Sequence, residues 1–594
     1  MQEQQKIKSG DLTLEELVAK QNYLFRVTNY QRHYVWTEKE VKQFLSDGEF
    51  CWRQKAEGIR FIHFAGQISL RKIETGRDMR TRVEIVDGQQ RLTTFILLVA
   101  IVCRKLSMEY RENFLSTMLW KKYFLSTAEC ADDEERLLLS HRDQVFWNGL
   151  TCQTGEVLKE CESESHKHLK IAAKVIKEYT EQMAAEKTEK EAAKTLYEYV
   201  EAIAVSFRFV ILTTYHDGYA YALYQIVNDR GVPLTSGELL KARTIELLSD
   251  KKYLALQAEQ IWDDILKDTG EETNRCLNWH YVAITGRQME SKKSATIHEQ
   301  YERVVFHCYN KRILSEAEQQ EIKRQLDHLE VNVKRIRVLT QGMIPEAVSG
   351  YTKVLFEALI KVLKNTFCIP IYLKILEMPE KQAIKTLNSI TPLLAKAFFM
   401  AKTMGGLHDG VIAKCYLEIW NYIDYSRADM DSIKEALERL VSRDNCRKEF
   451  ISRAKDNVYV RGASRNDKAK FMLLMLELYY LKSVERGGNE CGDDSVEFKV
   501  SEMSIEHILK ESVDPNEISR EFYSSLHKLG NLTLTGKRVN SRLKNADFED
   551  KRERYQKSPY FITREVGKSE HWKKEDFNSR QEKFMSDLEK IFEI

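Results

Sequence analysis

The sequence predicts a predominantly helical α+β protein, with a mixed α/β domain first, a helical region next, and a small unit of two strands and a helix near the end. Proline occurs only 7 times in 594 residues, while good helix formers abound, which favours helix throughout. Runs of β-branched and aromatic residues gather near the two ends. Because so long a chain exceeds one hydrophobic core, we expect domains over residues 1–245, 246–480 and 481–594.

The charge and cysteine content narrow the functional classes. Lys and Arg total 92 against 90 for Asp and Glu, so any nucleic-acid site must be a local basic patch. The 11 cysteines are scattered, with no CxxC pair or zinc-finger spacing, which indicates reduced thiols in a cytoplasmic protein. The longest apolar run, 95–103, is too short to span a bilayer, and the N-terminus has no signal-peptide core. We therefore expect a soluble cytoplasmic protein.

The N-terminal region is expected to mix strands and helices. Strands need short apolar runs rich in β-branched and aromatic residues, and helices need longer apolar periodicity. On this basis the sequence predicts strands over 24–27, 61–73, 82–86 and 205–212, a helix over 92–106, a charged helical stretch over 105–200, and a further helix over 220–227.

The rest of the chain is expected to be helical until its last hundred residues. Thr235 and Glu238 have the spacing of a capping box that opens a helix. Helical periodicity then continues over about 245–480. The polar stretch 485–495 predicts a loop, followed by strands over 496–500 and 503–505.

The segment Ser504-Ile505-Glu506-His507, followed by Gly530-Asn531 and Asn540, has the groups that a one-metal phosphodiesterase needs. Such an enzyme requires a base for water and hard oxygen ligands for a divalent ion. Neighbouring strand residues point to opposite sides, so one of Glu506 and His507 could bind metal while the other faces substrate. The Asn531 amide can hold the backbone that orients His507. Asn540 opens an expected helix, 540–555, and can return an oxygen to the ion.

Basic residues crowd this C-terminal segment and could neutralise DNA phosphates. A helix of alternating charge is more often a solvated face, so the basic run alone is a weak signal. The candidate DNA-binding residues are Lys537, Arg538, Arg542, Lys544, Lys551 and Arg552.

An upstream motif, Asp87-Gly88-Gln89-Gln90-Arg91, joins an expected strand to an expected helix. A glycine turn at a helix N-terminus exposes backbone N–H groups and makes an anion site. Arg91 adds a bidentate phosphate donor, and Asp87 could hold Mg²⁺, bind a ribose hydroxyl or polarise a water. The alternative is an ordinary helix start in which Gln89 and Gln90 only brace the loop.

Two further segments could complete a nucleotide site. One gathers aromatic rings with amide and guanidinium groups, suited to stacking a base and reading its edge, although its rings could instead pack in the core. The other places an arginine on a turn and a lysine in the helix that follows. Their candidate residues are Gln31, Arg32, Tyr34 and Trp36 in the first, and Asn228, Arg230 and Lys241 in the second.

Together these motifs resemble those of the GmrSD-type, modification-dependent (type IV) restriction endonucleases. The chain reads YQRHYVW, FAGQISL, VDGQQRLTT and NDRGVPLTSGELLK, then SIEHIL, LGNLTL and NSRLKNADFEDKRERYQKS. The resemblance covers about 20–245 and 455–594. It departs from the family pattern at His33 and Lys510, where proline is usual, and at Glu238, where aspartate is usual.

The resemblance implies a ParB/sulfiredoxin-like DGQQR domain that binds and hydrolyses a nucleoside triphosphate, with Asp87 and Arg91 in the reaction. It also implies a ββα-metal (HNH) nuclease in which His507 is the general base, Asn531 orients it, and Glu506 with Asn540 or Asn545 holds Mg²⁺ or Mn²⁺. The expected partner is double-stranded DNA, base- or backbone-modified, and the many expected helices offer surfaces for a homodimer. Two alternatives stay open: a nucleotide-switched DNA-binding or regulatory protein with an inactive nuclease head, and an N-terminal DNA reader without hydrolysis.

Overall fold

The computed structural model describes residues 7–20, 23–27, 33–75, 80–128, 131–154, 163–215, 235–248, 250–290, 295–311, 314–461, 466–485, 498–513, 518–543 and 546–594. The chain forms two compact units, the first from 1–277 with 290–330 and the second from 278–289 with 331–594. The class predicted from the sequence, helix-rich α+β, is confirmed.

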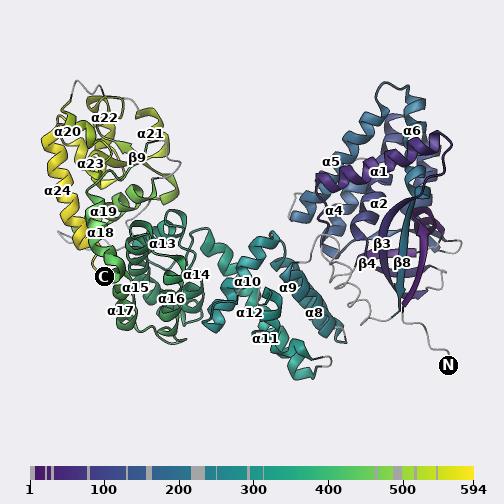
Figure 1. Ribbon diagram of the computed structural model, residues 1–594, viewed down its shortest axis with the longest axis horizontal. Helices are drawn as coiled ribbons and strands as arrows, with labels where there is room; N and C mark the ends of the chain where they lie inside the picture. Colours follow the sequence, from purple (N-terminus) through teal and green to yellow (C-terminus); the bar gives the residue numbers. More distant parts are fainter. Residues whose placement is uncertain are drawn as a thin grey trace. The chain divides into compact units, whose positions relative to one another are not determined.

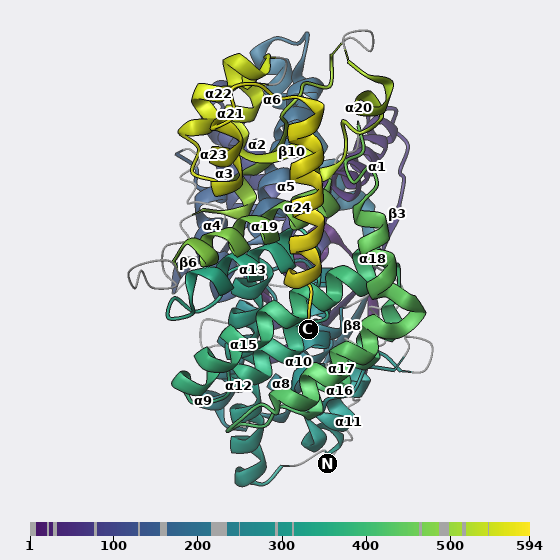
Figure 2. The ribbon, with the colours of Figure 1, turned by 90° about the vertical axis from the view of Figure 1, so that its left-hand side faces the viewer.

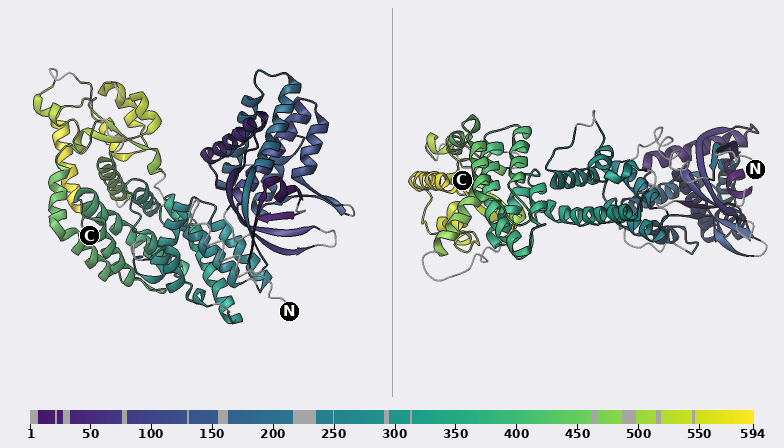
Figure 3. Two further views of the ribbon diagram at one scale, coloured as in Figure 1. Left: turned by 45° about the vertical axis from the view of Figure 1, so that its right-hand side comes forward. Right: turned by 90° about the horizontal axis from the view of Figure 1, so that it is seen from below.

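A six-stranded mixed sheet forms the centre of the first unit, and Figure 3 shows its twisted strands. The strands β8 and β3 are parallel, as are β4, β2 and β7, whereas β1–β8 and β3–β4 are antiparallel. In spatial order the strands are β1 (Ile7–Thr13), β8 (Phe207–Thr214), β3 (His63–Thr75), β4 (Thr81–Asp87), β2 (Tyr23–Val27) and β7 (Leu137–Leu138).

Helices gather over this sheet and share one hydrophobic core with it (Figure 1). The helix α2 is buried on nearly every side, as its unbroken apolar run predicts. The helices of this part of the unit are α1 (Glu38–Ala56), α2 (Gln89–Arg104), α3 (Asn113–Leu119), α4 (His141–Thr151), α5 (Glu164–Ala184) and α6 (Glu189–Ser206).

The strand predictions for β2, β3, β4 and β8 are confirmed within a few residues. The expectation of helix throughout 105–200 is wrong in part, because β5 (Leu125–Ala128) and β6 (Ala131–Glu135) form a small antiparallel hairpin there. Charged residues such as those of β6 occur in an edge hairpin as readily as in a helix, so the charged composition of this stretch did not distinguish the two. The helix expected over 220–227 lies outside the described residues.

The first unit continues with helices. The capping box predicted at Thr235 and Glu238 is confirmed at the start of α8. The helices are α8 (Ser236–Leu247), α9 (Lys252–Ile265), α10 (Gly270–Thr285), α11 (Ile297–Val304) and α12 (Glu316–Thr340), of which α10 and α12 run from one unit into the other.

The second unit begins as a helical bundle, which confirms the expectation of helix for this region. In α19 (Asp467–Glu485) the run from Phe471 to Leu478 is almost completely buried. The preceding helices are α13 (Gly350–Lys361), α14 (Ile369–Ile375), α15 (Glu380–Phe398), α16 (Asp409–Asn421), α17 (Met430–Ser442) and α18 (Cys446–Ala454).

The C-terminal part of this unit is built on two antiparallel strands, β9 (Met503–His507) and β10 (Leu532–Gly536). The long helix α24 (Lys574–Ile591) packs beside α19 (Figure 2). The shorter helices are α20 (Arg520–Ser524), α21 (Lys537–Leu543), α22 (Phe548–Gln556) and α23 (Phe561–Gly567).

Two predictions for this part need correction. The expected helix over 540–555 is two helices, α21 and α22, and Asn540 lies inside α21 instead of opening it. The strand expected over 496–500 does not form in its described residues, because Val500 begins a short 3₁₀ turn. The expected loop lies almost wholly outside the described residues.

The described cysteines are free thiols, as predicted. Within the described part of the chain, no helix combines the length and the apolar character needed to cross a membrane.

Candidate functional site

Strand β9 ends in Glu506 and His507, which pair across the ladder with residues of β10. Asn531 lies just before β10 and is completely buried. Its Nδ2 donates to the carbonyl oxygens of Leu509 (3.1 Å) and Leu526 (3.0 Å), and its Oδ1 accepts from the Leu509 amide at 2.9 Å. The Asn531 side chain therefore connects the backbone just after His507 to the backbone just before β10.

His507 is only 7% exposed. Its Nε2 lies 3.1 Å from His527 Nδ1 and 3.4 Å from Glu511 Oε1. The ring of Tyr459 meets it edge-on at 4.6 Å. Burial, with smaller contributions from His527 and Lys551, lowers the pKa of His507 to about 3. The imidazole is therefore neutral at neutral pH and keeps a nitrogen lone pair for a proton or a metal ion.

Glu506 forms a buried ion pair with Lys551. The ammonium lies 2.6 Å from the carboxylate and also donates to the His507 carbonyl oxygen at 2.7 Å. Burial raises the pKa of Glu506, and the Lys551 charge opposes that rise. Lys551 is 0% exposed. Its prediction as a DNA-binding residue is therefore wrong for this structure, because its charge is turned inward to Glu506.

The expected ion site between Glu506 and Asn540 fits poorly with this arrangement. The Lys551 ammonium already neutralises the Glu506 carboxylate. The Asn540 amide donates to Ser504 Oγ (2.5 Å) and to the Ile505 carbonyl oxygen (2.8 Å). A divalent ion on Glu506 Oε1 would compete with the buried Lys551 ammonium. The other expected ligand, Asn545, lies outside the described residues.

Sequence reasoning missed two residues of this centre, Glu511 and His527. Together with His507 they offer three ligand atoms within 4.8 Å of one another. Glu511 follows β9 and His527 precedes β10, so the same sheet that positions His507 brings them in. In the sequence, both residues lie in the segment between the two predicted motifs, close to the end of β9 and the start of β10, and this position could have indicated them.

The remaining basic candidates differ in exposure. Lys537 and Arg538, at the start of α21, are exposed, and Arg552 is half-buried. Lys544 lies outside the described residues, and so does the side chain of Arg542.

In the first unit, Gly88 sits at the turn between β4 and α2. Its φ of +93° is a left-handed value, and a Cβ there would lie 2.6 Å from a side-chain carbon of Ile68, so glycine is required. Gln90 accepts from the Val35 amide at 2.9 Å and donates to the His33 carbonyl oxygen at 3.2 Å. Gln90 therefore joins the predicted phosphate-binding motif, residues 87–91, to the described end of the predicted aromatic segment.

Most of the described nucleotide candidates are used inside the fold. Arg91 donates to the Ala65 carbonyl oxygen at 2.7 Å and lies 3.6 Å from Asp87. Tyr34 is buried and bonds Thr94 Oγ1 at 2.8 Å. Gln89 is also buried, and Trp36 packs on the core beside Phe44. The alternative that the aromatic rings pack in the core is confirmed for Tyr34.

Lys241 is 1% exposed, and its ammonium lies 2.6 Å from Asp263. The His33 ring also contacts Asp263 (3.4 Å) and contacts Asp143 at 2.9 Å. Burial opposes a charge on His33, but the two carboxylates outweigh it and raise its pKa to about 9. The remaining candidates, Gln31, Arg32, Asn228 and Arg230, lie outside the described residues.

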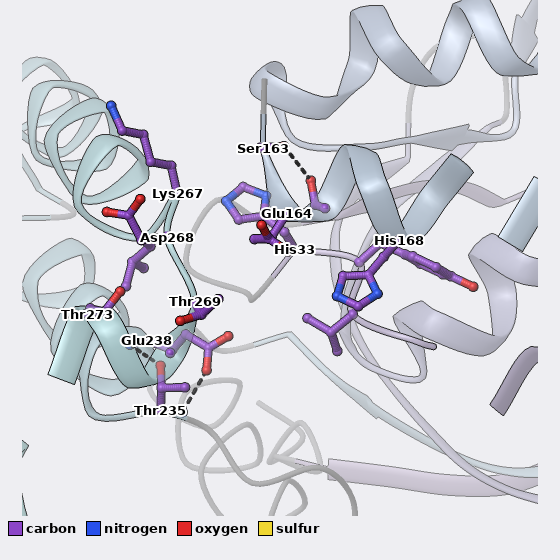
Figure 4. A pocket seen from close by; sticks show the side chains of 15 residues that line it. His33, Ser163, Glu164, His168, Thr235, Glu238, Lys267, Asp268, Thr269 and Thr273 are labelled. Carbon is purple, nitrogen blue, oxygen red and sulfur yellow. Dashed lines mark hydrogen bonds between the residues drawn. The ribbon is translucent and has the colours of Figure 1, made fainter. Parts of the chain in front are cut away.

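A pocket of about 220 Å³ opens beside His33 and Tyr34 (Figure 4). The N-termini of three helices border it, with the caps Ser163 on α5 and Thr235 on α8, and Thr269 before α10. Its other lining residues are Val35, Glu164, Ser165, His168, Glu238, Leu266, Lys267, Asp268, Gly270 and Thr273. Each cap already accepts one N–H of its helix, and the other first-turn N–H groups carry the partial positive charge that attracts an anion.

Comparisons with protein families place the two motif regions in one class of DNA-cutting enzyme. Residues 14–245 match the N-terminal domain of the GmrSD restriction endonuclease, and residues 444–587 match the C-terminal domain of the GmrSD restriction endonucleases. The chain belongs to the GmrSD restriction endonuclease family, as its motifs predicted. Membership supports the role of a restriction endonuclease that acts on DNA. A comparison with curated proteins gave no match.

Proposed function

We propose that the protein is a nucleotide-regulated, divalent-metal-dependent DNA endonuclease of the HNH type that restricts modified foreign DNA in bacterial phage defence. The observation that carries the proposal is the neutral His507 at the end of β9, with the antiparallel β10 and then α21 completing a ββα arrangement. Phosphodiester hydrolysis needs a group that activates water, and a neutral imidazole meets that need.

His507 activates the attacking water, either by taking its proton or by holding the ion that acidifies it. Asn531 keeps the chain beyond His507 in register with β10, and Lys551 fixes the His507 carbonyl oxygen. A divalent ion would lower the pKa of the water and offset charge on the phosphate. The exposed Lys537 and Arg538 are placed to contact phosphates of the DNA backbone.

The regulatory nucleotide would bind in the first unit, at the pocket beside His33. A volume of about 220 Å³ lies below the ~300–1,000 Å³ typical of small-molecule sites, so it suits the phosphates better than a whole nucleotide. Lys267, whose ammonium lies 2.8 Å from Asp264, also lines the pocket and would turn its positive charge to the phosphates. Because Glu164, Glu238 and Asp268 also line the pocket, the phosphates would enter as a magnesium complex. We propose that nucleotide hydrolysis accompanies binding and that residues 246–480 couple residues 1–245 to the nuclease in residues 481–594.

A second candidate is a nucleotide-switched DNA-binding protein whose nuclease head does not cut. The Glu506–Lys551 ion pair favours it, because it removes a carboxylate that the nuclease family pattern assigns to the ion. The two candidates differ in one result. The endonuclease nicks or linearises DNA when Mg²⁺ or Mn²⁺ is added, whereas the switched binding protein shifts DNA in a gel without breaking it.

The test of the endonuclease is cleavage of supercoiled plasmid by the full chain with Mg²⁺ or Mn²⁺, for the wild type and for His507→Ala. The matched control is His571→Ala, which changes an exposed histidine of the same unit. Cleavage by the wild type and the control, but not by His507→Ala, supports the proposal. Equal cleavage by all three proteins contradicts it.

The test of nucleotide regulation is the affinity of the full chain for ATP, GTP, CTP and UTP with Mg²⁺, together with phosphate release. Lys267→Ala should weaken binding by about tenfold, the value of one charged hydrogen bond. Lys190→Ala, an exposed lysine of α6 away from the pocket, is the matched control and should bind like the wild type. Unchanged affinity in Lys267→Ala would place the nucleotide elsewhere.

A further inference from the structure

The segments that flank β9 and β10 bring two imidazoles and a carboxylate to one point. His507 Nε2 is 3.1 Å from His527 Nδ1 and 3.4 Å from Glu511 Oε1. His527 Nδ1 is 3.8 Å from the same oxygen. These three atoms come from the end of β9, from the turn after it and from the segment before β10. The cluster therefore joins two residues four positions apart with a third, His527, that the pairing of β9 and β10 brings in.

The three separations match those of ligands around one ion. Two donors that each lie about 2.1 Å from an ion, at the tetrahedral angle, are about 3.4 Å apart. The observed values of 3.1, 3.4 and 3.8 Å bracket that distance. Glu511 Oε1 is buried and makes no hydrogen bond within the described part of the protein. A buried oxygen in that state costs free energy unless a ligand takes its lone pair.

Neighbouring groups hold the two rings in place. Tyr459 stacks on His527 with ring centres 5.5 Å apart and meets His507 edge-on at 4.6 Å. The backbone amides of Val458 and Tyr459 donate to the His527 carbonyl oxygen at 3.1 and 3.2 Å. Such outer contacts orient ligands around metal ions and raise affinity.

We propose that His507, Glu511 and His527 form the binding site of one divalent transition-metal ion, of the Zn²⁺, Mn²⁺ or Co²⁺ kind. Two imidazoles and one carboxylate, with a position left open for water, are a donor set of catalytic ions. The proposal rests on the proposed endonuclease and names the position of its ion. It also makes His507 a metal ligand, so that the bound ion acidifies the attacking water.

This position differs from the one that the family pattern implied. At Glu506 and Asn540 the carboxylate is neutralised by Lys551, and the asparagine amide holds Ser504 and Ile505. At the cluster, the exposed Arg461 guanidinium lies 3.7 Å from one Glu511 oxygen, Oε2, while the other, Oε1, faces the two imidazoles. Both positions involve the strand β9. They differ in which substitutions should abolish metal binding: those at Glu506 and Asn540, or those at His507, Glu511 and His527.

The test uses Co²⁺ as a spectroscopic probe on the full chain after treatment with a chelator. The wild type should bind one Co²⁺ with the visible absorption of a four- or five-coordinate site. Glu511→Gln and His527→Gln should each weaken binding by at least about tenfold. The rival-site variants are Asn540→Ala and Glu506→Gln, both of which leave Lys551 in place on the His507 carbonyl oxygen. These variants and His571→Gln should bind Co²⁺ like the wild type.

Loss of Co²⁺ in the rival-site variants, with normal binding in Glu511→Gln and His527→Gln, overturns the proposal. So does a wild type that binds no Co²⁺. Plasmid cleavage is measured on the same samples to separate this inference from the proposed function. Metal-dependent cutting that survives in Glu511→Gln and His527→Gln retains the endonuclease and rejects this ion site. Co²⁺ binding at the cluster without any cutting retains the site and rejects the endonuclease.

Discussion

The two units each contain a buried histidine in a charged setting, and the two rings are driven to opposite states. His33 lies between Asp143 and Asp263, which outweigh burial and raise its pKa to about 9. His507 has Lys551 and His527 nearby, and burial lowers its pKa to about 3. A ring that is charged at neutral pH and pairs with two carboxylates can hold together the helices α4 and α9, which carry them. A neutral ring is suited to chemistry, because it keeps its lone pair. Burial lowers the pKa of both rings, and at His33 two carboxylates outweigh it.

The largest expected effect comes from removing the cation beside His507. Lys551→Met leaves the buried Glu506 without its partner and should cost about 3–5 kcal/mol of unfolding free energy. The double variant Glu506→Gln/Lys551→Met should recover most of that loss, since no charge is left buried alone. Urea denaturation of the three proteins measures the effect. A loss below about 1 kcal/mol in Lys551→Met would contradict a buried Glu506–Lys551 pair and would remove the smaller, charge-based part of the contrast between the two histidines.

The next effect is the pH dependence of the first unit. The pKa of His33 is higher in the folded protein, about 9, than its ordinary value of 6.5. Its stabilisation is therefore complete below pH 6.5 and is lost as pH rises through 9, a total of about 3 kcal/mol. His33→Gln should lack this fall in stability. Pulse proteolysis in urea at pH 6.5 and pH 9.5, scored on peptides of the first unit, provides the measurement. An equal fall in wild type and variant would show that His33 is not the titrating cation.

A smaller effect is expected at the start of α8. Thr235→Ala removes the cap and should cost about 1 kcal/mol. Thr188→Ala removes an equivalent capping box from α6, away from the pocket, and should cost a similar amount. Only Thr235→Ala should also weaken nucleotide binding, because only that helix start borders the pocket. Equal nucleotide affinities in the two variants would show that the regulatory nucleotide does not bind at this pocket.

The smallest effect concerns the start of α21. Lys537→Ala and Arg538→Ala should each lower the slope of log affinity against log salt by about 0.9 for double-stranded DNA. Lys568→Ala changes an exposed lysine of the same unit that is paired with Glu565, and it should leave the slope unchanged. Fluorescence anisotropy between 50 and 200 mM salt resolves the difference. A slope that does not change in the α21 variants would move the DNA path away from this helix.

The sequence predicted the fold best where one signal dominates. The apolar run of α2 and the capping box of α8 were recognised because local periodicity and hydrogen-bond chemistry determine them. The polar strand β1 and the charged hairpin strand β6 were missed, since edge strands need not show an apolar pattern. The partner of β1, the strand β8, lies far away in the sequence, whereas β6 pairs with the neighbouring β5.

The candidate site was predicted in outline and missed in its contacts. His507 and Asn531 lie together as expected because both sit at the ends of the paired strands. The inward turn of Lys551, and the approach of Glu511 and His527, depend on loop and helix packing that spacing cannot reveal. The composition of a charged helix predicts that its lysines are exposed, but Lys551 is buried because it pairs with the buried Glu506 carboxylate.

The most direct test of the central claim is cleavage of paired DNA substrates, one unmodified and one base-modified. The wild type and His507→Ala are compared with Mg²⁺ or Mn²⁺, each with and without nucleoside triphosphates. The account predicts metal-dependent cutting by the wild type that favours modified DNA and responds to nucleotide, and none by His507→Ala. Cutting that persists in His507→Ala, or a wild type that binds DNA but never breaks it, would contradict the account.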